Sequence, residues 1–187
     1  MPTSALPGAA SGDFLELEGV ISINAGHFAS KRDLSNGAGW RSVPGLGRTG
    51  SAVTILPSTA EIPDMRGPRL SYRFNVAAGA DATVHVRLLP TYPLISGQPL
   101  KLAIAIDEHS PLPLSVNSGF DNDTDEWKRR VVANATGASL RLPRKLTSGW
   151  HTLHLIGVDA GVVVDKIVID LGGLQSSYDG PPETRIR

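Results

Sequence analysis

Strict alternation of apolar and polar residues, repeated along most of the chain, is the feature that most constrains its fold. Segment 70–76 places an apolar residue at every second position, and segments 84–88 and 102–106 repeat the pattern. A period of two puts the apolar set on one face of a half-buried β-strand. Further strands are expected at 14–18, 20–24, 52–56, 127–133, 139–142, 150–158 and 162–170. Helical spacing is sustained nowhere in the sequence.

Roughly ten short strands separated by turns rich in Gly, Pro, Asn and Asp are typical of a β-sandwich or barrel. The 14 prolines agree, because proline favours loops and strand edges over helix interiors. Internal repeats are absent, which excludes solenoids and propellers. The sequence therefore predicts an all-β fold, an antiparallel β-sandwich of the jelly-roll type.

The chain divides into three parts by composition. Residues 1–12 are small residues with Pro and Gly and predict a linker lead, residues 13–175 carry the strand patterns, and residues 176–187 form an irregular tail. The tail contains Gly and two prolines, so it is expected to lie over the domain or to reach another one.

Charge and cysteine content exclude several classes of function. The 18 basic and 18 acidic side chains balance, so electrostatics give no reason to expect nucleic acid or a membrane as partner. No run of apolar residues is long enough to cross a bilayer. Without cysteine the chain has no disulfide, no zinc-thiolate site and no thiol nucleophile. A neutral ligand such as a glycan fits this balance better.

A glycine-rich turn between two expected strands is the first candidate site. Trp40 precedes this turn and Arg48 lies within it. The turn contains one proline, Pro44, and three glycines, at positions 45, 47 and 50. Its letters include G-x-G-x-x-G, but no helix follows, which argues against a dinucleotide-binding loop. Sugars stack on aromatic rings, and a guanidinium suits a uronate carboxylate. We therefore predict carbohydrate contacts at Trp40 and Arg48, with a packing role for Trp40 as the alternative.

The second candidate group surrounds Trp127, which follows an acidic turn. Asn117 and Asp121 precede it and could read sugar hydroxyls, while Trp127 could stack on the ring or pack against the domain. The acidic run 121–126 begins like a calcium loop but places Glu126 where the tight turn needs glycine. It is better interpreted as a solvated turn. Trp150, at the start of another strand, is expected to pack in the core.

Three segments carry a resemblance to a known family: 40–53 (WRSVPGLGRTGSAV), 161–174 (GVVVDKIVIDLGGL) and 177–183 (SYDGPPE). They resemble the C-terminal domain of glycoside hydrolase family 115, the xylan α-1,2-glucuronidases, over roughly residues 13–183. The resemblance implies a galactose-binding-like sandwich, similar to carbohydrate-binding modules of families 6 and 35. In family 6 modules a cleft at the loop edge uses two aromatic residues, and Trp40 and Trp127 occupy comparable places in strand order.

The resemblance also bears on metal binding. Related modules begin with an E-A-E strand whose glutamates help hold a structural calcium, and segment 23–28 (INAGHF) aligns with it. Asn24 and Gly26 stand where the glutamates belong, so the charge that attracts a divalent ion is missing. We expect neither a metal nor a cofactor.

Two functions remain open at this stage. One is a non-catalytic carbohydrate-binding module that anchors a larger, secreted or periplasmic bacterial enzyme to xylan or glucuronoxylan. The other is a structural domain that packs on the catalytic domains of the parent enzyme, forms a homodimer and contributes its glycine-rich loop to a partner's active site. Catalytic motifs such as G-x-S-x-G and H-E-x-x-H are absent from the sequence.

Overall fold

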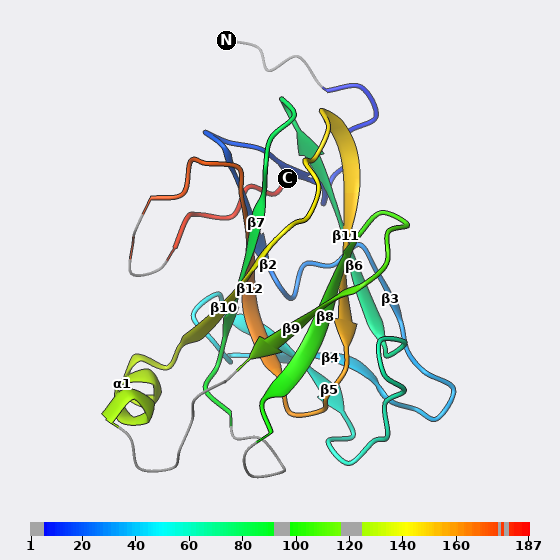
Figure 1. Cartoon of the computed structure of the whole chain (residues 1–187), viewed down its shortest axis with the longest axis vertical. Coiled ribbons are helices and arrows are strands. Elements are labelled where there is room, and N and C mark those ends of the chain that lie inside the picture. Colours follow the sequence, from blue (N-terminus) through cyan, green and yellow to red (C-terminus); the bar gives the residue numbers. More distant parts are fainter. Residues whose placement is uncertain (1–5, 92–97, 117–124, 176, 178–179) are drawn as a thin grey trace.

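Two β-sheets packed face to face form the body of the protein (Figure 1). The computed structural model describes residues 6–91, 98–116, 125–175, 177 and 180–187, without the side chains of residues 126 and 127. The described elements are β1 (Phe14–Leu15), β2 (Val20–Asn24), β3 (Ser30–Arg32), β4 (Gly39–Pro44), β5 (Ser51–Leu56), β6 (Arg69–Val76), β7 (Thr83–Leu88), β8 (Leu100–Ile106), β9 (Leu112–Val116), α1 (Asp125–Ala133), β10 (Thr136–Arg141), β11 (Gly149–Gly157) and β12 (Val163–Asp170).

The first sheet has the order β1-β6-β11-β8-β9, with β3 also pairing with β6. The second has the order β10-β7-β12-β5-β4, with β2 also pairing with β12. Every pairing is antiparallel except the short parallel pair of β1 and β6. The predicted antiparallel sandwich is therefore confirmed. Strands β3, β4 and β9 were not anticipated.

The core lies between the sheets and consists of the residues that alternate in the sequence. Leu70, Tyr72 and Phe74 on β6 are each 0% exposed, and the same parity fills the interior from β7, β8 and β11. Because successive side chains of a strand point to opposite faces, the apolar residues at every second position all point inward and fill the layer between the two sheets.

The segment 127–133 is a helix, and its prediction as a strand was wrong. Helix α1 begins at Asp125 and carries basic residues up to Arg130 in its last turn, the charge distribution that a helix dipole favours. The valines at 131 and 132 suggested a strand, yet they lie in the last turn and are 46% and 87% exposed. Within the described residues, α1 is far too short to cross a membrane.

Both ends of the described chain contact the sandwich. Thr184 donates its amide hydrogen to Ser22 O (3.0 Å), and Ile186 donates to Asp13 O (2.7 Å), so the C-terminal tail runs between β2 and β1. At the other end, Pro7 O accepts the Trp150 indole N–H at 2.9 Å. The described residues 180–187 of the tail therefore lie over the domain, and the lead contacts the sandwich at residue 7.

Candidate functional site

The glycine-rich loop connects β4 to β5 and has a backbone that only glycine adopts easily. Gly45, Gly47 and Gly50 have φ angles of 74°, 79° and 87°, the left-handed region that strains other residues. The Gly45 amide hydrogen bonds to Gly50 O at 2.9 Å and closes the loop. The glycines therefore serve the shape of the turn itself.

A buried carboxylate fills the inside of this loop. Asp165 is 2% exposed, and its Oδ1 accepts the Thr49 amide at 3.1 Å and the Thr49 hydroxyl at 2.7 Å. Its Oδ2 accepts the Arg48 amide at 3.2 Å. A Cβ on Gly47 would lie 2.2 Å from Asp165 Oδ1, so this glycine makes room for the carboxylate. The space beside Gly47 is therefore occupied by a side chain of the domain itself.

Asp165 is available to the loop because β12 is interrupted at this point. The register of β12 against β7 shifts between Val164 and Lys166. On its other edge, β12 pairs with β5 through Val164 and with β2 from Lys166 onward. The bulge interrupts the ladder where the partner strand changes, and at this point the Arg48 and Thr49 amides of the glycine-rich loop donate to the Asp165 carboxylate.

Arg48 connects the loop to helix α1. Its guanidinium donates to the carbonyl of Ala133, the last residue of α1, so it caps the C-terminal end of the helix. The side chain is half-buried and also borders a hollow that contains Asn24, Lys166 and Glu183. Arg48 thus has a structural partner, while its predicted contact with a uronate stays a proposal.

Trp40 is a core residue, and its prediction as a stacking platform was wrong. Its side chain is 1% exposed, and the indole Nε1 donates to Pro68 O at 2.8 Å. It lies opposite Ile55 of β5, which is 0% exposed. A ring buried on both faces and satisfied in its polar atom offers nothing to a sugar.

The remaining predicted residues belong to the part of the chain around α1. Trp127 lies in the first half of the helix, but its side chain is outside the described set. Asn117 and Asp121 also lie outside the described residues. Since Arg48 holds the C-terminal end of α1, the glycine-rich loop, Asp165 and the helix form one connected unit that carries Trp127.

A shallow polar hollow lies at the same end of the sandwich as α1 (Figure 1). It has a volume of about 240 Å³ and is formed by the loops after β5, before β8 and after β11. Asp159 in its wall accepts the Lys101 amide through Oδ2 at 2.7 Å. The lining combines hydroxyl, amide, carboxylate and small apolar groups, namely Ser58, Thr59, Ala60, Ile62, Gln98, Pro99, Leu100, Val158, Asp159 and Ala160.

Glu183 lies beside the strand that lacks the two glutamates. Its Oε1 accepts the Asn24 amide at 3.1 Å and is 2.7 Å from His27 Nδ1. The contact joins residues 156 positions apart, so no local pattern could predict it. The described residues contain no group of three His, Cys, Asp or Glu side chains placed to hold a metal.

Trp150 occupies the outer face of the first sheet, contrary to the expected core position. The Arg73 guanidinium stacks on its ring at 3.9 Å from the centroid. On the same face, His154 Nδ1 is 2.9 Å from Ser71 Oγ. Burial lowers the pKa of His154, and the charge of Arg69 adds to the shift, so this ring is neutral near pH 7. On this outer face of the first sheet, Trp150 and His154 are therefore already in contact with neighbouring side chains of the domain.

The role of Arg48 gives a first testable prediction. We expect Arg48→Ala to remove the charge-assisted hydrogen bond to Ala133 O at the end of α1, a loss of about 1.5–3 kcal/mol, and so to speed amide exchange of α1 roughly tenfold or more. Hydrogen exchange followed by mass spectrometry measures this. Arg129→Ala is the matched control, because Arg129 bonds to Asp125 O within α1. Equal exchange in the two variants would show that the loop does not hold the helix.

Comparison with known proteins identifies a domain family for the chain. The model of the glycosyl hydrolase family 115 C-terminal domain matches residues 13–183. Among proteins of curated function, none matches the chain.

Solved structures with the same fold include both enzymes and isolated modules. One is a family GH115 4-O-methyl-α-glucuronidase with specificity for decorated arabinogalactans (22% identity, TM-score 0.59), of which the alignment covers 82% of this chain and 18% of that chain. The chain thus spans about a fifth of that enzyme.

Two carbohydrate-binding modules match over nearly their whole length. The C-terminal family 6 module of a laminarinase from Zobellia galactanivorans has 15% identity and a TM-score of 0.54, with 81% of this chain and 98% of that chain covered. A family 6 module from Clostridium stercorarium, solved with cellobiose, has 16% identity and a TM-score of 0.51, with 88% and 98% covered. At these identities the likeness establishes the fold.

Proposed function

The chain belongs to the glycosyl hydrolase family 115 C-terminal domain family, and on this premise we propose that it is a non-catalytic module that binds xylan-type polysaccharide for a parent α-glucuronidase. The observation that carries the proposal is the fold: the same sandwich, at similar length, forms carbohydrate-binding modules, one of them solved with cellobiose. The family description names a C-terminal domain, which supports a role apart from the catalytic part of the parent enzyme.

The end of the sandwich that carries α1 is the proposed binding surface. Its hollow offers Ser58, Thr59 and Gln98 as hydrogen-bonding groups at a scale suited to sugar hydroxyls. Asp159 adds a carboxylate that accepts hydroxyl hydrogens. Trp127, on the helix at the same end of the sandwich, is the proposed stacking ring, with Asn117 and Asp121 as proposed hydroxyl contacts.

The proposed ligand and location follow from the family and the charge. A neutral chain suits a polysaccharide with few charges, and uronate side groups would be attracted to the Arg48 region without a strongly basic surface. We place the protein outside the cytoplasm, as part of a larger glycan-degrading enzyme. The catalytic domains of that enzyme are its proposed protein partner.

A structural role is the second candidate, and the exposed valines on α1 favour it. Val132 is 87% exposed and Val131 46%, and they lie beside the basic residues Lys128 and Arg129. Exposed apolar residues on a helix are suited to a protein partner, either the parent enzyme or a second copy of this chain.

Polysaccharide titration separates the two candidates. We expect the isolated domain to migrate more slowly in gels that contain glucuronoxylan than in gels that contain none, and to show less retardation with cellulose derivatives. Isothermal titration calorimetry with arabinoxylan and glucuronoxylan then ranks the decorations. A docking domain would migrate alike in every gel and would instead change mass with concentration in analytical ultracentrifugation.

A further inference from the structure

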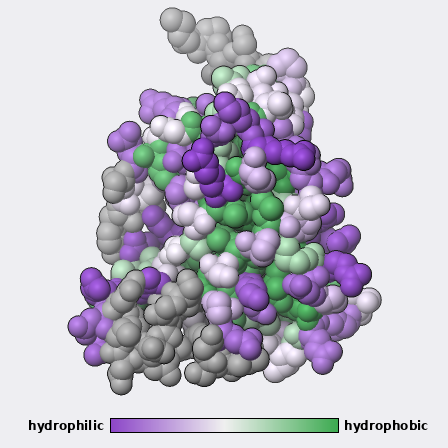
Figure 2. Space-filling model, viewed as in Figure 1, coloured by the Kyte–Doolittle hydropathy of each residue, from purple (hydrophilic) through white to green (hydrophobic). Residues whose placement is uncertain are grey.

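A second cavity opens at the end of the sandwich opposite α1. It has a volume of about 250 Å³ and lies between the β8–β9 hairpin and the connection from β10 to β11. Its floor belongs to the core and is aliphatic, comprising Ile106, Leu112, Leu142 and Leu146, and the exposed Pro143 also lines the cavity. Figure 2 shows apolar surface in the middle of this face with hydrophilic residues on both sides.

The polar wall of the cavity is rigid and already satisfied. Asp107 accepts the Thr152 amide through Oδ1 (2.8 Å) and contacts His151 Nδ1 through Oδ2 (2.8 Å). The other ring nitrogen of His151 lies 3.0 Å from Thr147 O. Asp107 also has a φ of 53°, and a strained residue persists only where its surroundings fix it. Both oxygens of this acid are therefore committed to the fold.

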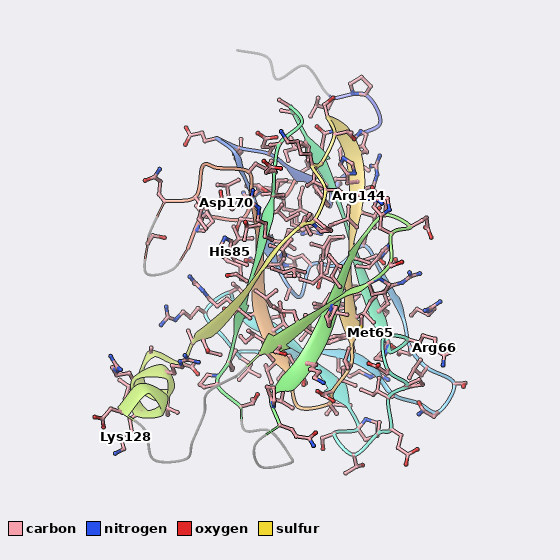
Figure 3. All side chains as sticks on the ribbon, in the orientation of Figure 1. Met65, Arg66, His85, Lys128, Arg144 and Asp170 are labelled. Atoms are coloured by element: carbon pink, nitrogen blue, oxygen red, sulfur yellow. The ribbon has the colours of Figure 1, made fainter. Side chains whose placement is uncertain are left out.

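The basic groups at the rim are not committed. Arg144 and His109 are exposed, line the cavity and make no side-chain hydrogen bond or ion pair with the described residues. Figure 3 shows Arg144 beside the upper end of β11, at the mouth of this region. Ser110 adds a hydroxyl to the same rim. The charge that remains available for a ligand is therefore positive.

The chemistry of the lining indicates the class of ligand. A sugar would need an aromatic platform, but the floor of the cavity is aliphatic. The His151 ring is tilted against Phe74, with 5.6 Å between the ring centroids, and His109 lies at the exposed rim. The aliphatic floor favours a ligand with an apolar body. The guanidinium of Arg144 favours a carboxylate on that ligand, because its planar fork of N–H groups can donate two hydrogen bonds to the two oxygens. The volume of about 250 Å³ lies just below the range of about 300–1,000 Å³ typical of ligand pockets, so the apolar body of the ligand must be small.

We propose that this cavity is a binding site for a small apolar carboxylate, with its ring or branched chain against Leu142 and Leu146 and its carboxylate on Arg144. The site is separate from the proposed polysaccharide surface, which lies at the other end of the sandwich (Figure 1). Its ligand would therefore bind together with a polysaccharide, without competition.

Three probes that share one apolar body test this proposal. In calorimetry with the whole chain, 3-phenylpropionate should bind saturably, whereas the neutral 3-phenylpropan-1-ol should bind roughly tenfold more weakly. The cationic 3-phenylpropylamine should bind weakest. Amide shifts in a ¹H–¹⁵N spectrum should concentrate in 106–112 and 142–151. Equal affinity for the acid and the alcohol would overturn the carboxylate contact, and shifts elsewhere would overturn the site.

Matched variants assign the charge to one residue. Arg144→Gln should weaken 3-phenylpropionate roughly tenfold and leave the alcohol unchanged. Lys145→Gln removes the same charge from the next exposed residue, which does not line the cavity, and should bind as the unaltered chain does. Both positions are exposed, so both variants should fold. An equal loss of 3-phenylpropionate affinity in the two variants would indicate a general attraction of the acid to positive charge and would overturn the proposal. The absence of saturable binding of the acid to the unaltered chain would overturn it as well.

Discussion

Trp40→Ala should lower the free energy of unfolding by about 3–5 kcal/mol, the usual cost of truncating a large buried aromatic residue. The change removes a side chain that is 1% exposed and leaves the carbonyl of Pro68 without its indole donor at 2.8 Å. Urea unfolding followed by circular dichroism measures the loss.

A second variant separates packing from hydrogen bonding. Trp40→Phe keeps an aromatic ring but lacks the indole N–H. It should therefore lower the free energy of unfolding less than Trp40→Ala does, and the difference between the two variants gives the contribution of packing. If Trp40→Ala instead left the unfolding midpoint unchanged, the ring would not be in the core, and the stacking role would return.

Gly47→Ala should destabilise the domain by about 3–5 kcal/mol, combining left-handed backbone strain of about 1–2 kcal/mol with the loss of hydrogen bonds to a buried carboxylate. The added Cβ would lie 2.2 Å from Asp165 Oδ1 and would push that group away from the Arg48 and Thr49 amides. Thermal and urea melts of the purified variant give the value.

Gly45→Ala is the matched control for this change. Gly45 has a φ of 74° against 79° for Gly47, but no atom lies within 4 Å of its added Cβ. It should therefore show the backbone strain alone, about 1–2 kcal/mol. Equal losses in the two alanine variants would mean that the loop does not enclose Asp165 as described.

The sheets could be predicted because their information is local. Each of the strands β6, β7 and β8 carries its own alternation, so the inward face is set residue by residue before any pairing occurs. Strand β3 could not be predicted in this way, because all three of its residues are exposed and no face is apolar. Helix α1 was missed because nine residues with two β-branched valines give too short a helical pattern.

Strand parity explains the position of Trp150 but not that of Trp40. Leu153 and Leu155 point into the core, so Trp150, of the opposite parity, points outward. That signal was present in the sequence. Trp40 is different: β4 buries its first two residues and then exposes Ser42, so its own alternation does not indicate where the ring lies.

The loop and its partner could not be related from sequence alone. Asp165 lies 116 residues from Thr49, and its pattern is that of an ordinary strand residue. The clustering of glycine marked the loop as special, but only the bulge in β12 identifies what it encloses. Long-range polar contacts of this kind have no periodic pattern in the sequence. The fold could therefore be predicted, whereas the contact between Asp165 and the glycine-rich loop could not.

Polysaccharide affinity of two tryptophan variants tests the proposed function most directly. In calorimetry with glucuronoxylan, Trp127→Ala should lose about 1–3 kcal/mol of binding, with stacking on nucleobases as the guide, while its melting temperature stays close to that of the unaltered chain. Trp150→Ala, which removes a ring from the far end of the first sheet, should bind normally. Unaltered affinity in Trp127→Ala, or no binding by the unaltered chain, would contradict the account.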